Sequence, residues 1–142
     1  MTKQVVDDDR TDLPAQIDEP VVAININQQY PHAKNNADDL FKCTSGIWRV
    51  SRERANKARY ALAVYQGIIK EVYEIERWVP ATQATLNYWR ERERAQGNDF
   101  SGTHEGRSEF VGAVAPETIR QKYVGRRMPV RHSQNPIRYF NC

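Results

Sequence analysis

Runs of apolar residues along the chain predict a set of short strands. Four runs rich in Val, Ile, Tyr and Phe are bounded by Gly, Pro, Asn or Ser, a pattern that is typical of strands. They cover residues 21–26, 47–50, 108–115 and 135–141. The stretch 60–78 has a similar composition, but it holds Gly67, which would cost a helix about 1 kcal/mol. We therefore predict that this stretch forms a hairpin that turns at Gln66 and Gly67.

Polar residues that can cap a helix precede other segments. These helices are expected at residues 37–43, 52–59 and 116–123. Asn36 and Ser51 stand at the N-cap positions of the first two, where a side-chain oxygen can accept from free backbone amides. Pro116 suits the first position of the third helix, and Gly125 suits its end.

The remaining segments lack a clear period and are expected to be irregular. Residues 28–36 form a loop, and residues 79–106 form a long loop with a helical turn near residues 87–94. Residues 1–19 are acidic and interrupted by proline, so we expect a flexible tail.

The elements together define one α+β domain over residues 20–142. The strands outnumber the helices and are short. We therefore predict a curved, mainly antiparallel sheet or a small β-barrel, with short helices inserted between the strands.

Four stretches resemble a poorly characterised prokaryotic and phage family of small domains. They are "DDLFKCTSGIWRVS", "ARYALAVYQGIIKEVYEIERWVPA", "EFVGAVAPETIRQKYVGR" and "QNPIRYFNC", which together span most of residues 38–142. The Gly-x-Trp strand, the EVY-x-I-x-x-W hairpin and the NPI-x-Y strand are also loosely similar to PUA-type barrels and their ASCH and EVE relatives. That resemblance implies a cleft that binds RNA or modified bases.

Composition places the chain among water-soluble proteins. Apolar residues make up 39% and charged residues 27% of the 142 residues, and the formal net charge is +3. No apolar run approaches the roughly 18 residues that a membrane span needs, and the first residues lack the basic-then-apolar pattern of an export signal. We expect a cytoplasmic protein with no membrane partner.

Charge is distributed unevenly along the chain. Residues 1–20 hold two basic and six acidic residues, a net charge of −4, whereas residues 107–142 hold seven basic and two acidic residues, a net charge of +5. A basic C-terminal region fits an anionic partner. The acidic tail could also fold over this region and mask it.

The basic C-terminal region supplies the candidate ligand-binding residues. Arginine pairs with phosphate through two hydrogen bonds, aromatic rings stack on bases, and side-chain amides can read a base edge. The candidates for these roles are Arg120, Lys122, Tyr123, Arg126, Arg127, Gln134, Asn135, Arg138 and Trp89. Trp89 and Tyr123 are expected to be partly exposed. Trp48, Trp78 and Phe110 lie in apolar strands and are more readily explained as core residues.

We predict from these residues a non-catalytic module that binds nucleic acid or a phosphorylated small molecule. An alternative is a phage-type counter-defence protein that sequesters a nucleotide signal or blocks a protein partner. A homo-oligomer remains open. The second alternative is a metal-dependent nuclease of the GIY-YIG type, but Tyr65 and Tyr123 are far apart and no carboxylate follows Gly125.

Other reactive residues show no spacing that indicates chemistry. The two cysteines and three histidines lack a zinc-binding pattern. His104 lies in a glycine-rich loop, and Glu74 and Glu76 alternate with basic residues as on a solvated strand face. We therefore assign no catalytic residue, metal or cofactor.

Overall fold

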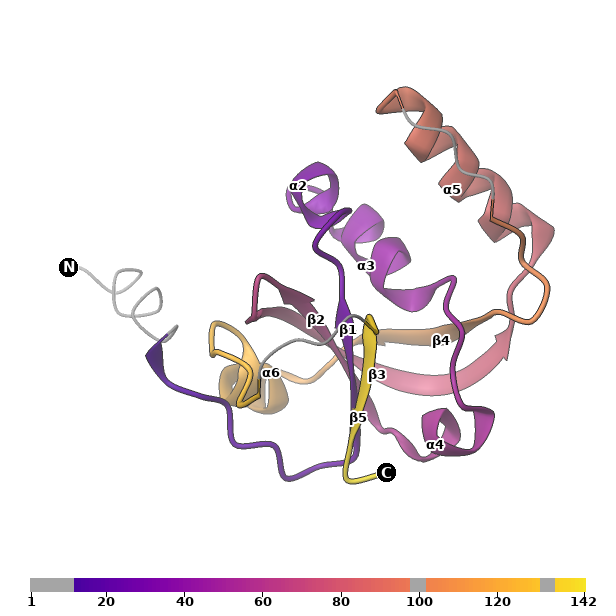
Figure 1. The fold of residues 1–142 in the computed structure, drawn as a ribbon. Helices are drawn as coiled ribbons and strands as arrows, with labels where there is room; N and C mark the ends of the chain where they lie inside the picture. Colours follow the sequence, from indigo (N-terminus) through magenta and orange to yellow (C-terminus); the bar gives the residue numbers. More distant parts are fainter. Residues whose placement is uncertain (1–11, 98–101, 131–134) are drawn as a thin grey trace.

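The computed structural model describes residues 12–97, 102–130 and 135–142, and it contains an open, curved sheet with helices on both faces (Figure 1). Its strands are β1 (Val21–Asn25), β2 (Tyr60–Tyr65), β3 (Ile68–Pro80), β4 (Ser108–Val114) and β5 (Ile137–Phe140). The helices in the described residues are α2 (Tyr30–Ala33), α3 (Ala37–Ser45), α4 (Arg52–Lys57), α5 (Gln83–Ala95) and α6 (Glu117–Tyr123).

The strand order is β4-β3-β2-β1-β5. β1 and β2 run parallel, and the three other pairings are antiparallel. The predicted α+β class and curved, mainly antiparallel sheet are confirmed. The sheet is not closed, so the alternative of a small barrel is wrong.

The hairpin of β2 and β3 turns where the sequence predicts. Gln66 and Gly67 both have positive φ angles, 51° and 80°. A two-residue turn with positive φ at both positions matches the right-handed twist of the strands it joins. Glycine adopts this conformation without steric cost, which explains Gly67 in the middle of an otherwise strand-forming stretch.

The two faces of the sheet carry separate hydrophobic clusters because side chains alternate along each strand. Val22 and Ile24 of β1 belong to the cluster covered by α2, α3, α4 and α5, which also contains Trp78 and Phe110. Val21 and Ala23 belong to the opposite cluster, beneath α6. The interpretation of Trp78 and Phe110 as core residues is thus confirmed.

The capping residues also act as predicted. The Asn36 side chain accepts from the backbone amides of Asp38 and Asp39, and the Ser51 side chain accepts from the amide of Arg54. These local contacts begin α3 and α4 at the expected positions.

Three predicted segments differ in the structure. The predicted strand 47–50 is wrong, because only Trp48 makes a bridge, to Ser108. The predicted loop 79–106 contains the thirteen-residue helix α5. Thr82 caps this helix and its Arg, Glu, Leu and Ala residues are good helix formers, so local preference outweighs the proline that precedes it. The predicted loop 28–36 contains the short helix α2.

Part of the predicted tail is packed on the domain. Pro14 forms a bridge with Arg127, and Ala15 is buried in the cluster beneath α6. The tail prediction for residues 1–11 lies outside the described residues. In the described ranges, no helix combines the length and apolar character needed to cross a membrane.

Candidate functional site

Arg120, the first candidate of the basic region, is held by carboxylates. Its guanidinium donates to both oxygens of Glu71, over 2.7 and 3.2 Å, and to Glu117 over 2.8 Å. The hydrogen bonds to Glu71 raise the pKa of Arg120 above its ordinary value. A bidentate pair of this kind occupies the geometry that a phosphate would need.

Lys122 is held in the same way by the N-terminal segment. Its ammonium group donates to Asp18 over 3.1 Å and to Glu19 over 3.0 Å. Burial alone would lower the pKa of Lys122, but the hydrogen bonds from its ammonium group to these carboxylates raise it to about 12. Lys122 therefore joins α6 to the segment before β1.

Tyr123 is buried, which corrects the prediction that it is partly exposed. Its side chain has 0% exposure and its hydroxyl donates to Glu19. Burial and this hydrogen bond raise the pKa of Tyr123 to about 12. Helix α6 turns the ring into the core beneath the sheet, so it cannot stack on a base.

Arg126 and Arg127 follow α6 in a loop that pairs through its backbone. The carbonyl of Arg126 accepts from Ile69, and Arg127 exchanges backbone hydrogen bonds with Leu13 and Ala15. The Arg127 side chain is exposed, whereas Nε of Arg126 is buried without a hydrogen-bond partner.

The C-terminal candidates that the structure describes lie in a local turn and beside a small cavity. The side chain of Asn135 accepts from the amide of Ile137, two residues on, in a local turn. Arg138 of β5 lines a cavity of about 30 Å³, the space of roughly one water molecule. Gln134 lies outside the described residues. Several described residues of the basic region are therefore engaged in ion pairs and turns.

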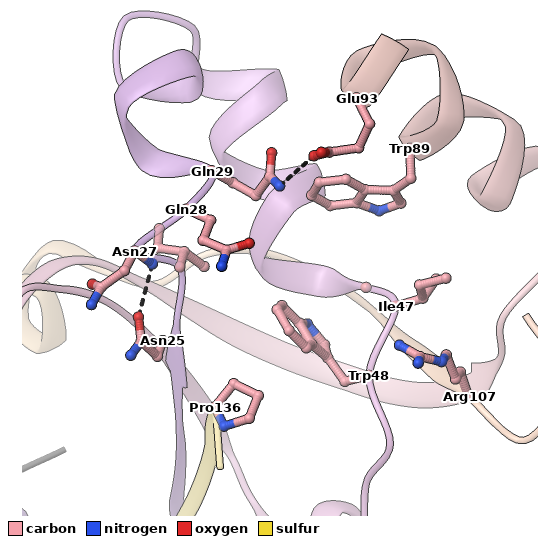
Figure 2. Close-up of a pocket in the computed structure, with 12 residues that line it drawn as sticks. Asn25, Asn27, Gln28, Gln29, Ile47, Trp48, Trp89, Glu93, Arg107 and Pro136 are labelled. Atoms are coloured by element: carbon pink, nitrogen blue, oxygen red, sulfur yellow. Dashed lines mark hydrogen bonds between the residues drawn. The ribbon is translucent and has the colours of Figure 1, made fainter. Parts of the chain in front are cut away.

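A larger cavity of about 490 Å³ lies on the opposite face of the sheet (Figure 2). Its volume falls within the range of small-molecule sites, roughly 300–1,000 Å³. It is lined by Asn25, Ile26, Asn27, Gln28, Gln29, Gly46, Ile47, Trp48, Trp89, Glu93, Arg107 and Pro136. Among the predicted ligand-binding residues that the structure describes, only Trp89 belongs to this set.

Four residues with side-chain amides line the pocket where the chain leaves the carboxyl end of β1. The chain leaves this strand as Asn25-Ile-Asn27-Gln28-Gln29, beside the end of the parallel strand β2. The Asn27 side chain accepts from the backbone amide of Gln66 over 2.7 Å, which ties this segment to the hairpin turn. The ends of parallel strands are a common position for ligand sites.

Helix α5 supplies another wall of the pocket. Trp89 and Glu93 are four residues apart, so they lie one above the other on the same face of the helix. Tyr88 and Arg92 form a second pair at the same spacing, and both donate to Asp39 of α3, over 2.7 and 2.9 Å. This anchor holds α5 against α3 and directs Trp89 and Glu93 towards the pocket.

The segment after α3 completes the pocket. Trp48 is half-buried, and its indole nitrogen donates to the carbonyl of Thr44 over 2.8 Å, which fixes the ring orientation. A Cβ at Gly46 would lie 2.7 Å from Cβ of Glu109, so no side chain fits there without a shift. The close approach of this segment to β4 places Trp48 beside Arg107 (Figure 2).

Two pocket residues carry buried donors without a partner. Nε1 of Trp89 and Nε of Arg107 are buried and make no hydrogen bond, and both residues line the cavity. An unpaired buried donor costs roughly 1–3 kcal/mol. Trp89 is 6% exposed, which corrects the prediction that it is partly exposed. In Figure 2 its ring nitrogen lies on the edge that faces Trp48 and Arg107.

The sequence carries a signal for this pocket that lies outside the basic C-terminal region. Four amide residues, Asn25, Asn27, Gln28 and Gln29, follow directly on a buried apolar strand. A cluster of amides at a strand end provides both donors and acceptors at a position where ligands bind. The pairing of Trp89 with Glu93 could be found only once residues 83–95 were recognised as a helix.

The nuclease alternative finds little support in the arrangement of its residues. Tyr65 ends β2, whereas Tyr123 ends α6, so the two tyrosines do not lie on neighbouring strands. Within residues 12–97, 102–130 and 135–142, no three His, Cys, Asp or Glu side chains are grouped in a way that could hold a metal ion.

The surroundings of Cys43 indicate a packing role for this residue and not a reactive one. Cys43 is buried and its thiol donates to the carbonyl of Leu40 over 3.3 Å. Burial raises the pKa of Cys43 to about 12, so its thiol stays protonated and unreactive at neutral pH. Cys142 is also a free cysteine.

The pocket thus combines indole rings, amides, one arginine and one glutamate. Comparisons with models of protein families, with curated proteins and with solved structures find no significant match to this chain.

Proposed function

We propose that this protein is a non-catalytic module that binds a nucleotide-like anion in the pocket between β1, α5 and the segment after α3. A planar base stacks on the indole ring of Trp48, side-chain amides contact its polar edges, and Arg107 pairs with the phosphate. The function expected from the sequence is retained, but its location moves from the basic C-terminal region to the opposite face of the sheet.

The unpaired donors of Trp89 and Arg107 are the observation that carries this proposal. Both residues line one cavity, and both have a nitrogen that makes no hydrogen bond. A ligand with acceptor atoms would relieve this cost if the side chains turned to present these nitrogens to the cavity. An anion is favoured since Arg107 carries a positive charge.

The other lining residues support binding rather than catalysis. The described residues around the cavity include no Ser, Thr, Cys, His, Lys or Tyr that could act as a nucleophile. Glu93 is the one titratable acid among them, and it accepts a hydrogen bond from Gln29 over 2.6 Å. Sequestration of a small nucleotide signal, the alternative suggested by the sequence, would use this same pocket.

A free nucleotide is favoured over extended nucleic acid. Arg120 and Lys122, which would have followed a phosphate backbone, are paired with Glu71, Asp18 and Glu19. Nucleic-acid binding that relies on many phosphate contacts weakens steeply with salt. A ligand held mainly by stacking and amides depends on salt much less.

The test is a fluorescence titration of the purified protein with 5′-nucleotides and with single-stranded oligonucleotides, at low and high salt. Trp48 and Trp89 line the pocket, so nucleotide binding should change the tryptophan emission with a saturable curve. Tight, strongly salt-dependent binding of oligonucleotides without nucleotide binding would overturn the proposal, as would no binding of either.

The variants Trp89→Phe and Trp78→Phe form a matched pair for this test. Both remove a buried indole nitrogen that has no partner, but only Trp89 lines the pocket. We expect Trp89→Phe to change nucleotide affinity and Trp78→Phe to leave it unchanged. Equal effects of the two variants on affinity would show that the pocket is not the binding site.

A further inference from the structure

We infer that the ligand of this pocket carries a terminal phosphate monoester, which is held between Arg107 and a second arginine, Arg49. This inference rests on the function proposed above, in which Arg107 pairs with the phosphate of a nucleotide. Arg107 lines the cavity, and Arg49 directly follows Trp48, another lining residue. Arg49 was not among the ligand-binding residues predicted from the sequence.

Backbone pairing between the segment after α3 and the start of β4 sets the two arginines opposite each other. Trp48 and Ser108 exchange two backbone hydrogen bonds, over 2.8 and 2.9 Å, and their bridge is antiparallel. In an antiparallel pairing, the residue that follows one partner lies opposite the residue that precedes the other. Arg49 is therefore opposite Arg107, at positions whose side chains share one face.

The Arg49 side chain also extends along the turn that precedes Arg107. A Cβ built on Gly106 would lie 3.4 Å from Nη1 of Arg49, so this guanidinium lies beside the backbone of that turn. Arg49 is exposed, whereas Arg107 is partly buried. Arg107 is thus the more fixed of the two cations, and Arg49 can adjust its position to a ligand.

The two arginines are like charges without a counterion of their own. In the part of the chain that the structure describes, neither side chain forms an ion pair or a hydrogen bond. By contrast, Arg120 on the other face of the sheet pairs with Glu71 and Glu117. Like charges at opposite positions of a strand pairing destabilise it. An anion that contacts both guanidinium groups replaces this repulsion with attraction.

A phosphate monoester fits two arginines better than a phosphodiester does. A monoester carries a charge of about −1.5 to −2 at pH 7 and three oxygens that accept strong hydrogen bonds. The phosphodiester of a nucleic-acid chain carries a single negative charge. Since each guanidinium can donate two parallel hydrogen bonds to phosphate, the second arginine gains more from the doubly charged group. This difference also favours a free nucleotide over nucleic acid.

The experiment compares each 5′-monophosphate, AMP, GMP, CMP and UMP, with the 3′,5′-cyclic nucleotide of the same base. Affinities for the full-length protein are measured by isothermal titration. The cyclic form keeps the base but has a singly charged phosphodiester. For every base that binds, the monophosphate should bind roughly tenfold more tightly than the cyclic form, an effect in the range of one charge-assisted hydrogen bond.

Two arginine variants separate a direct contact from a general effect of surface charge. Arg49→Gln should weaken binding of the monophosphate roughly tenfold and change binding of the cyclic form little, so that the ratio of the two affinities approaches one. Arg52→Gln removes the same charge from an exposed residue three positions further along the chain and should preserve the ratio. Thermal melting of both variants checks that the fold is intact.

The outcomes distinguish this inference from the function on which it rests. Equal affinities for the monophosphate and the cyclic form, or tighter binding of the cyclic form, would overturn the monoester assignment and leave the nucleotide pocket in place. An unchanged ratio in Arg49→Gln, or equal losses in Arg49→Gln and Arg52→Gln, would overturn the role of Arg49. Absence of binding by every nucleotide would overturn both the inference and the proposed function.

Discussion

The two polar regions of this protein differ in how their leading donors are paired, although Nε of Arg126 beside α6 is also buried without a partner. On the α6 face, Arg120 and Lys122 donate to three carboxylates of other segments, at 2.7 to 3.1 Å. In the pocket on the other face, Trp89 and Arg107 each retain a buried nitrogen with no partner. We therefore base the proposed site on unpaired donors that line a cavity and not on the density of positive charge along the sequence.

The α6 face uses its charges to hold the chain together. Lys122 and Tyr123 both contact Glu19, and Arg127 pairs with the backbone on either side of Pro14. These contacts attach residues 12–19 to α6. Asp18 and Glu19 of the acidic segment thus contact Lys122 of the basic region. In this structure the contact is part of the folded domain.

The largest expected effect tests whether Arg120 is structural. The substitution Arg120→Ala leaves Glu71 without its bidentate partner. The Glu71 side chain is only 15% exposed, so water cannot fully replace that partner. We expect a loss of about 2–3 kcal/mol in the free energy of unfolding, measured by urea denaturation, with nucleotide affinity unchanged. The double variant Arg120→Ala with Glu71→Gln should recover part of this loss. A loss of affinity without a loss of stability would instead make Arg120 a ligand-binding residue.

The next largest effect is expected on nucleotide affinity and tests whether Trp48 belongs to the binding site. Trp48→Ala removes the stacking surface and should weaken nucleotide binding by roughly 10- to 100-fold, since stacking on one aromatic side chain contributes about 1–3 kcal/mol. Trp48→Phe keeps an aromatic face and should retain most of the affinity, although it loses the bond to Thr44. Affinity that is the same in all three proteins would exclude Trp48 from the site. Circular dichroism provides the control for folding.

A smaller effect is expected on the pH dependence of the free energy of unfolding, and it tests how Glu19 attaches the N-terminal segment to α6. Burial alone would raise the pKa of Glu19, but the hydrogen bonds from Tyr123 and Lys122 and the charge of Lys122 lower it below 4.5. A carboxyl group with a lowered folded-state pKa stabilises the fold above its unfolded-state pKa, and this stabilisation is lost as the pH falls through the folded-state value.

Glu19→Gln should therefore destabilise the protein by about 1 kcal/mol at neutral pH, the contribution of a partly buried ionic contact. The difference in unfolding free energy between this variant and the original chain should shrink as the pH is lowered below about 4.5. A difference that persists unchanged in acid would mean that the charge of Glu19 is not responsible.

The smallest effect is expected at Arg127, one of the candidate ligand-binding residues of the basic region. The Arg127 side chain is exposed, and its contact to the carbonyl of Asp12 is long, at 3.4 Å. Arg127→Ala should change the free energy of unfolding by less than about 0.5 kcal/mol and leave nucleotide affinity unchanged. A clear loss of binding to oligonucleotides in this variant would return the basic region to consideration as the site.

The amino-acid sequence by itself determined the local features of this protein. The turn at Gln66 and Gly67, and the helix starts at Asn36 and Ser51, follow from conformational preferences and hydrogen bonds within a few residues. The α+β class followed from the succession of these elements. Helix α5 could also be predicted from the sequence, because its Thr82 cap and its helix-forming composition are local features.

The tertiary structure alone decided which side chains meet. Glu19 and Lys122 are 103 residues apart, and Gln29 and Glu93 are 64 residues apart, so no local pattern connects them. Their contacts depend on the strand order and on the docking of α5 against Asp39. Whether an arginine is paired or able to receive a ligand is a property of such long-range contacts. That is why the sequence indicated an anion-binding protein, and only the fold moved the proposed site to the opposite face of the sheet.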